Sequence, residues 1–156
     1  MRETIINGRP LHDVTSPLLA VLSEFYSSFN ARDVEGSMAN WARQKDVIMC
    51  NPIGGIRHGW EAICEGYQRI MQGATHVYVE FYDYQLVESS DMFLAVGRER
   101  GYAQQASADQ VQKVELAIRT SRIFRRIQDR WQQVHHHGSI DDPDLLKQYQ
   151  NFIKGE

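Results

Sequence analysis

The sequence has only two cysteines, Cys50 and Cys64, too few for the disulfide framework of a small secreted protein. We therefore expect free thiols in a reducing cytoplasm. Long apolar runs are also absent, because no stretch approaches the roughly 20 apolar residues that a membrane-spanning helix needs. The segment Met1–Asn7 lacks the apolar core of a signal peptide. These absences predict a cytoplasmic protein without a membrane partner.

Positive charge is not in excess either, since 17 lysines and arginines stand against 20 acidic residues and the formal net charge is −3. A strongly basic surface is the usual mark of a nucleic-acid-binding protein, so nucleic acid is not an expected partner. The length of 156 residues suits one domain with an ordinary core. We expect a single domain over residues 1–156, with its core at about 15–140 and a C-terminal helical extension at 141–156.

Helical periodicity dominates the first half of the chain. Ser16 is a typical helix cap followed by Pro17 in the first turn, and apolar residues then recur at helical spacing through Phe29. Asp33 is the corresponding cap of a second, shorter helix. The first dozen residues show no such period and are expected to form a loose arm. The expected helices cover residues 17–29, 33–41 and 60–71 and, after Asp142, residues 143–153.

After Gly73 the apolar period changes from helical spacing to two, which is typical of half-buried strands. Short polar segments separate the strands and suit turns between antiparallel neighbours. Helices followed by long strands predict an α+β fold, a half-barrel whose N-terminal helices pack on one face of a curved antiparallel sheet. A cleft between helices and sheet is a usual place for a small ligand. The expected strands cover residues 47–50, 77–82, 92–102, 111–127 and 131–139.

The last expected strand contains three consecutive histidines, His135, His136 and His137. Alternate side chains of a strand point to opposite faces, so at most two of the three share one pocket. We expect His135 and His137 to face the pocket and His136 to face away. Two ligands fall short of the three or four that zinc usually takes, and the remaining histidines are scattered. Neither a metal site nor a cofactor is expected.

Four segments, in this order and spacing, carry a resemblance to a known superfamily: Phe29–Asp33, Asn51–Gly55, Gly59–Ile63 and Trp131–Ser139. They resemble the SnoaL-like and nuclear-transport-factor-two-like (NTF2-like, cystatin-like) domains, a superfamily that also includes ketosteroid isomerases and scytalone dehydratase. Within it, the last two strands are most similar to the association (hub) domain of calcium/calmodulin-dependent protein kinase, although Gly138 stands where the hub pattern has an arginine. The resemblance implies the cone-shaped fold and a homodimer formed sheet to sheet.

The resemblance to the hub domain also implies a ligand. It places Arg98 and Arg122 on the pocket wall, where the corresponding hub arginines hold a small carboxylate. A guanidinium in a partly dry cleft needs an anion, which predicts an anionic small-molecule ligand. The alternatives are an internal salt bridge to Glu99, Glu115 or Glu80, or a strand face exposed to solvent. The other residues expected at the pocket are His135, His137, Phe29, Trp41, Trp60, Tyr67 and Asn51, and we expect two of the four aromatic side chains to touch the cavity.

The residues that ketosteroid isomerases use for catalysis are not matched. Their carboxylate base falls on Asn51, and an amide cannot accept a proton near neutral pH. Their tyrosine falls on Phe25, with Tyr26 pointing in a different helical direction, and their acid falls near Ser121, where no acid lies. We therefore expect a small-molecule-binding SnoaL-like domain.

An enzymatic function stays open as the alternative. A small-molecule isomerase, dehydratase or cyclase would use His135 or His137 as the base, with Asp46 or Asp83 as its acid partner. A histidine and a carboxylate within hydrogen-bond reach in the cavity would favour this alternative. Arginines paired with internal carboxylates would argue against the anion pocket.

Overall fold

Residues 4–11 and 16–155, which the computed structural model describes, form four helices and six strands. The predicted order is confirmed, with helices first, long strands next and a short helix last. None of the described helices has the length and apolar character needed to cross a bilayer. The elements are α1 (Pro17–Asn30), α2 (Val34–Asn40), β1 (Ile48–Cys50), β2 (Arg57–His58), α3 (Trp60–Met71), β3 (Thr75–Glu88), β4 (Met92–Ala106), β5 (Val111–Ile127), β6 (Arg130–Ser139) and α4 (Pro143–Lys154).

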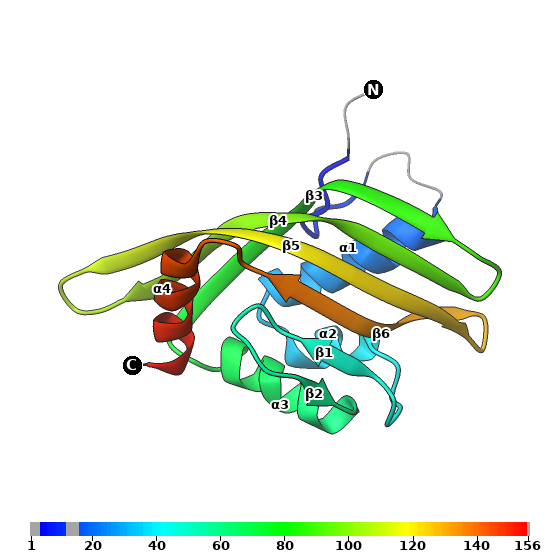
Figure 1. Cartoon of the computed structure of the whole chain (residues 1–156), viewed down its shortest axis with the longest axis horizontal. Helices are drawn as coiled ribbons and strands as arrows, with labels where there is room; N and C mark the ends of the chain where they lie inside the picture. Colours follow the sequence, from blue (N-terminus) through cyan, green and yellow to red (C-terminus); the bar gives the residue numbers. More distant parts are fainter. Residues whose placement is uncertain (1–3, 12–15, 156) are drawn as a thin grey trace.

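The strands form one curved sheet in the order β2-β1-β6-β5-β4-β3. Neighbouring strands are antiparallel except for β1 and β6, which are parallel. Figure 1 shows α1, α2 and α3 beneath the long strands, with α4 at one end of the sheet. The predicted α+β half-barrel is therefore confirmed.

Side-chain caps begin three of the helices, as the sequence indicates. Ser16 accepts a hydrogen bond from the backbone N–H of Leu19 at 3.5 Å, and Asp33 accepts one from Gly36 at 2.9 Å. Asp142 accepts bonds from the first backbone N–H groups of α4. Each cap satisfies a donor that the first turn of a helix leaves without an intrahelical partner.

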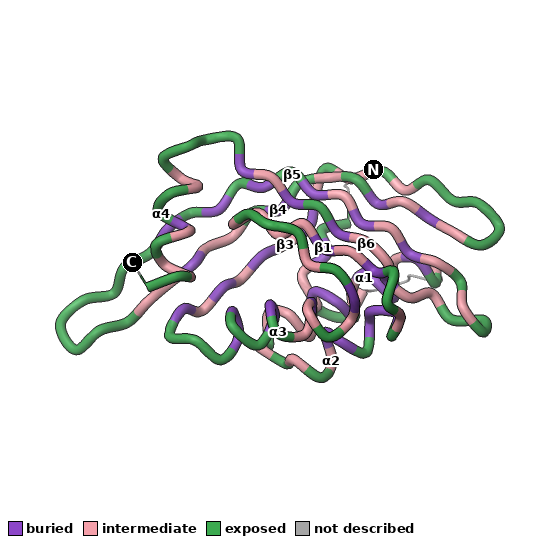
Figure 2. The backbone as a smooth tube through the Cα atoms, turned by 60° about the horizontal axis from the view of Figure 1, so that its bottom comes forward, coloured by how far each residue is buried: buried purple, intermediate pink, exposed green. Residues whose placement is uncertain are grey.

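The inner face of the sheet supplies a large part of the core. Every second residue of β5 from Val114 to Phe124 is buried, whereas the residues between them are exposed or half-buried. The alternation of burial classes along the strands is visible in Figure 2. This parity decides which charged side chains enter the interior, because a residue and its direct cross-strand partner share one face.

The expectation of a loose N-terminal arm is wrong at Ile6. This residue is fully buried and pairs with Phe81 of β3. The two residues exchange both backbone hydrogen bonds, at 2.9 and 2.7 Å. A single bridge of this kind has no periodic pattern by which the sequence could reveal it. Residues 1–3 and 12–15, also part of the expected arm or its end, lie outside the described residues.

Asn30, the last residue of α1, ties that helix to the sheet. Its side-chain amide donates to the carbonyl oxygen of Val79 at 2.8 Å and accepts from the Val79 N–H at 2.9 Å. The same amide nitrogen donates to the carbonyl oxygen of Asn7 at 3.1 Å. One side chain thus joins α1, β3 and the N-terminal segment.

Candidate functional site

The concave side of the sheet encloses a small cavity, here called the interior cavity. Its volume is about 30 Å³, close to the room that one water molecule occupies. Apolar side chains from α1, α3, β3 and β5 supply most of its wall. The polar side chains that line it are Asn51, Tyr67, Glu99, Arg122, His136 and Tyr149.

A buried ion pair lies in this wall. Nη2 of Arg122 on β5 donates to Oε1 of Glu99 on β4 at 3.0 Å, and the two side chains are only 3% and 5% exposed. Tyr26 of α1 donates its hydroxyl hydrogen to the same carboxylate oxygen at 2.5 Å and accepts a bond from Nε of Arg122 at 3.3 Å. The guanidinium therefore finds its counter-charge inside the protein.

Polar side chains continue from the ion pair toward α2. Nη1 of Arg122 donates to Oε1 of Gln133 at 2.7 Å, and Nε2 of Gln133 donates to Oδ1 of Asn40 at 3.3 Å. Asn40 in turn donates to the carbonyl oxygen of Val21 at 2.9 Å. The aromatic ring of Phe25 lies 4.1 Å from the guanidinium carbon, in cation–π geometry. This chain of bonds offsets the cost of burying a charge.

The ion pair and burial shift the titration of the neighbouring groups. Burial raises the pKa of the Tyr26 and Tyr67 hydroxyls above their usual value, and the positive charge of Arg122 opposes this rise in both cases. Burial lowers the pKa of Arg122, but the hydroxyl of Tyr26 and the carboxylate of Glu99 outweigh it and leave this pKa raised. Arg122 stays charged, and both tyrosines stay neutral at physiological pH.

His136 lies in the interior, which corrects the expectation that it faces away. It is the direct cross-strand partner of Arg122, so both share the inner face, and it is 5% exposed. Its Nε2 lies 2.7 Å from Oγ1 of Thr120, whereas its Nδ1 has no hydrogen-bond partner among the described residues. Burial lowers the pKa of His136 well below its usual value, and nearby Arg122, His135 and His137 act in the same direction. His136 is therefore neutral near pH 7.

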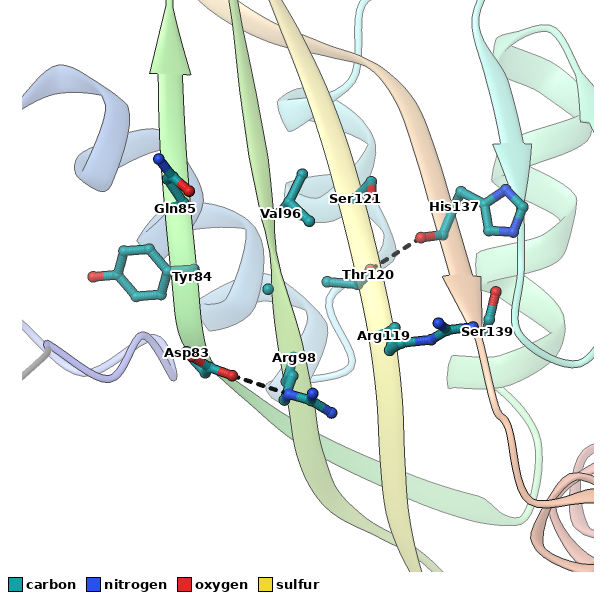
Figure 3. A pocket seen from close by; sticks show the side chains of 11 residues that line it. Asp83, Tyr84, Gln85, Val96, Arg98, Arg119, Thr120, Ser121, His137 and Ser139 are labelled. Carbon is teal, nitrogen blue, oxygen red and sulfur yellow. Dashed lines mark hydrogen bonds and ion pairs between the residues drawn. The ribbon is translucent and has the colours of Figure 1, made fainter.

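Arg98 and Arg122 lie on opposite faces of the sheet, so the expectation that they share a pocket wall is wrong. Arg98 pairs in register with Arg119, three residues from Arg122, and alternate strand residues face opposite sides. Arg98 lies in a second, open hollow of about 620 Å³ on the outer face, together with His137 (Figure 3). Its Nε donates to Asp83 at 3.0 Å, and Arg119 pairs with Asp141.

The remaining predicted site residues are divided between different places. Phe29 and Tyr67 line the interior cavity, whereas Trp41 and Trp60 line a separate hollow beside α2. Tyr67 accepts a hydrogen bond from the indole of Trp41 at 3.2 Å. Asn51 lines the interior cavity, but its side-chain oxygen accepts from the backbone N–H of Ile53, which stabilises the turn after β1.

The histidine–acid pairs expected for an enzyme do not meet. His135 donates through Nδ1 to the carbonyl oxygen of Ile48 at 3.0 Å. Asp83 pairs with Arg98 and is 68% exposed, and Asp46 lies 4.0 Å from Arg125 and is 71% exposed. Within residues 4–11 and 16–155, no hydrogen bond joins a histidine to a carboxylate, and no three potential metal ligands gather at one point.

The site that the sequence predicts lacks several interior residues, among them Tyr26, Glu99 and His136. The sequence presents Glu99 only as a structural partner for the arginines. It nevertheless stands between two arginines on a strand, and this alternation already puts it on the face opposite to Arg98 and Arg100. The resemblance to ketosteroid isomerases places the tyrosine position on Phe25, but in the structure both Phe25 and Tyr26 enter the interior, and the Tyr26 hydroxyl reaches the acid.

Comparison with known proteins supports the architecture. Residues 18–143 match the family model of the SnoaL-like domain. No curated protein matches the chain. A Thiobacillus denitrificans structure named after the calcium/calmodulin-dependent protein kinase type II association domain is similar, with 23% identity, a TM-score of 0.64 and coverage of 79% of this chain and 94% of that chain.

Two further solved structures show the same fold. One is from Streptomyces avermitilis, belongs to the NTF2-like family and is provisionally named a dehydratase, with 21% identity, a TM-score of 0.69 and coverage of 79% of this chain and 93% of that chain. The other is a ketosteroid isomerase-like protein from Erwinia carotovora atroseptica, with 16% identity, a TM-score of 0.66 and coverage of 85% of this chain and 100% of that chain. At these identities the likeness shows the fold alone.

Proposed function

The chain belongs to the family of SnoaL-like domains, and we propose that it is a small-molecule-binding member whose interior cavity takes an uncharged, mostly apolar organic molecule. The family's architecture includes isomerase-like and dehydratase-named proteins among its solved structures, which supports a small organic molecule as the ligand class. The absence of net charge in the cavity wall and its apolar lining support an uncharged, mostly apolar ligand.

The observation that carries this proposal is the pairing of Arg122 with Glu99. An arginine in a dry cavity attracts an anion only while its own charge lacks a partner. Here the carboxylate of Glu99 occupies that place at 3.0 Å, so the pair brings no net charge to the cavity. An uncharged ligand therefore fits this interior better than the anionic one expected from the sequence. Arg98, the second arginine of that expectation, lies outside the interior cavity.

A ligand larger than a water molecule needs more room than the cavity has, and α4 is the element best placed to provide it. Tyr149 is the buried residue of α4, and it lines the interior cavity. Hydrogen bonds from Gln150 to Ile53, and from Thr75 and Gln105 to the carbonyl oxygen of Phe152, attach the rest of the helix. Displacing this one helix enlarges the cavity without breaking the strand pairing. We propose it as the entry for the ligand.

Binding is favoured over the enzymatic alternative. An isomerase, dehydratase or cyclase of the expected kind needs His135 or His137 next to an acid in the cavity, and Asp46 and Asp83 are both engaged by arginines at the surface. The neutral His136 in the cavity has no carboxylate within hydrogen-bond reach among the described residues, so it lacks the partner that would stabilise its protonated form.

We also propose a homodimer formed through the outer face of the sheet, and a cytoplasmic location. The outer face carries the open hollow around Arg98 and Arg119, with Val96 43% exposed within it. The thiols of Cys50 and Cys64 are both free, which supports a reducing compartment. Sedimentation analysis of the wild type and of Val96→Glu tests the dimer. A change to monomer in the variant is expected, and a monomeric wild type would overturn this part of the proposal.

Titration with phenol, followed by amide NMR shifts, tests the binding proposal, with benzoate as the charged counterpart. We expect phenol to shift the signals of cavity residues and benzoate to shift them much less at equal concentration. Ile118→Phe fills the cavity and should abolish these shifts, while the matched substitution at an exposed site, Ile56→Phe, should leave them intact. Tighter binding of benzoate, or phenol shifts that survive Ile118→Phe, would overturn the proposal.

A further inference from the structure

His136 is a buried titratable side chain of the interior cavity that the ion-pair network does not use. The network around Arg122 engages Tyr26, Glu99 and Gln133, whereas the His136 ring forms its hydrogen bond with Thr120. The ring nevertheless lines the same cavity. A polar group in this position needs a hydrogen-bond partner for each of its nitrogens.

The hydrogen bond to Thr120 indicates which nitrogen carries the proton. Oγ1 of Thr120 lies 2.7 Å from Nε2 of His136 and 3.4 Å from the carbonyl oxygen of His137. If the Thr120 hydroxyl donates to that carbonyl, it must accept from Nε2–H of His136. The hydroxyl and Nε2–H then each have a hydrogen-bond partner. If the hydroxyl donates to Nε2 instead, Nδ1–H becomes a buried donor without a partner, which is the rarer and costlier defect. The first arrangement leaves a bare lone pair on Nδ1.

From this arrangement we propose that Nδ1 of His136 accepts a hydrogen bond from the ligand, and that the ligand is an uncharged molecule with a hydroxyl or N–H donor on an apolar body. Nδ1 is buried and has no partner among the described residues, so it has lost its hydrogen bond to water without replacement. A donor from the ligand would restore that hydrogen bond. This inference rests on the proposed function, because it names the atom through which the interior cavity recognises its ligand.

The charge state of the imidazole supports a donor over an anion. Burial and the positive charge of Arg122 lower the pKa of the ring and keep it neutral near pH 7, so it offers no positive charge to a carboxylate. An ionised carboxylate has acceptors only and cannot partner the lone pair. The apolar part of the wall, including Phe25, Val79 and Ile118, suits a hydrocarbon ring or chain attached to the donor.

Two matched probes and two matched variants test the inference. Phenol carries the donor and toluene lacks it, while His136→Phe removes the acceptor and His137→Phe makes the same change on the outer face. Relative to toluene, phenol should bind His136→Phe about tenfold more weakly than it binds the wild type, as expected for one lost hydrogen bond. The ratio of the phenol affinity to the toluene affinity should be the same in His137→Phe as in the wild type. An unchanged ratio in His136→Phe would overturn the inference.

A measurement on the wild type covers the case in which His136→Phe does not fold. The ¹⁵N shifts of the ring should identify Nε2 as protonated and Nδ1 as bare, and saturating phenol should shift Nδ1 toward a hydrogen-bonded value. A protonated Nδ1, or an Nδ1 signal that saturating phenol leaves unchanged because water alone occupies the cavity, would overturn the inference. Binding of both probes at the cavity with no effect of His136 would overturn the inference and leave the proposed function standing. Absence of any cavity binding would overturn both.

Discussion

Glu99 and Arg122 lie on adjacent strands with their charged groups 3.0 Å apart, and both are almost completely removed from solvent. This relationship decides the electrostatic character of the interior. A cavity wall with an unpaired arginine would select an anion, whereas a wall with this ion pair presents no net charge to a ligand. The pair also makes the stability of the cone depend on residues that line its interior cavity.

Removing the carboxylate of Glu99 should strongly destabilise the protein, because it leaves the buried guanidinium of Arg122 without a counter-charge. We expect Glu99→Gln to lower the free energy of unfolding by about 3–5 kcal/mol in urea denaturation. The double variant Glu99→Gln, Arg122→Met should lose less than Glu99→Gln alone. Asp83→Asn is the control, since its pair with Arg98 is exposed and should cost at most about 1 kcal/mol. Equal losses for Asp83→Asn and Glu99→Gln would contradict a stabilising role for the buried pair.

The stability of the protein should depend on pH through His136. Its pKa is lowered in the folded state, so between the usual value of about 6.5 and this lower value the unfolded chain binds the extra proton and the folded one does not. The free energy of unfolding is therefore unaffected by the titration of His136 above a pH of about 6.5. Below that pH it decreases, by up to about 1.4 kcal/mol per pH unit. Arg122, His135 and His137 all disfavour the protonated ring, and Glu99 is already paired.

Urea denaturation at several pH values between about 6.5 and 5 measures this dependence. In His136→Gln the slope should be smaller than in the wild type by close to one proton. The exposed His58 provides the matched control, and His58→Gln should keep the wild-type slope. A slope that is the same in all three proteins would show that His136 titrates normally.

Tyr149 should control access to the interior cavity. Tyr149→Ala removes the buried ring of α4, so we expect a loss of about 3 kcal/mol in stability together with faster binding of phenol. Stopped-flow measurement of the association rate and amide hydrogen exchange of α4 check the two effects. Gln148→Ala, at an exposed position of the same helix, should change neither. An association rate that Tyr149→Ala does not alter would place the entry elsewhere.

Asn30 should not tolerate replacement by aspartate, although the two side chains have the same shape. Its amide nitrogen donates to the carbonyl oxygens of Val79 and Asn7, and an ionised carboxylate at this position can only accept. We expect Asn30→Asp to cost about 1–3 kcal/mol in thermal or urea unfolding near pH 7, and less at acidic pH where the carboxyl is protonated. A neutral effect at pH 7 would show that these bonds contribute little.

The helices, the long strands and their order were predictable because each carries its own signal. The caps at Ser16, Asp33 and Asp142 and the change of period after Gly73 are local features, and the structure confirms them. The bridge between Ile6 and Phe81 depends on a contact between distant parts of the chain, which no local pattern encodes.

The site was harder to predict, because its composition depends on which face of each strand turns inward. Parity along one strand correctly separates His136 from His135 and His137, but it does not say which side is the interior. The register between strands decides this by setting His136 against Arg122 and Arg98 against Arg119. The expected pocket mixes the two faces of the sheet, because it combines Arg122 of the inner face with Arg98 and His137 of the outer face and leaves His136 out.

A crystal structure with 4-bromophenol tests the central claim most directly, because the bromine can be located by its anomalous scattering. We predict the ring inside the interior cavity, beside Ile118, with its hydroxyl oxygen about 3 Å from Nδ1 of His136. We also predict an unbroken ion pair between Glu99 and Arg122. An empty interior cavity, or bromophenol found in the outer hollow beside Arg98 and Arg119, would contradict binding through the interior.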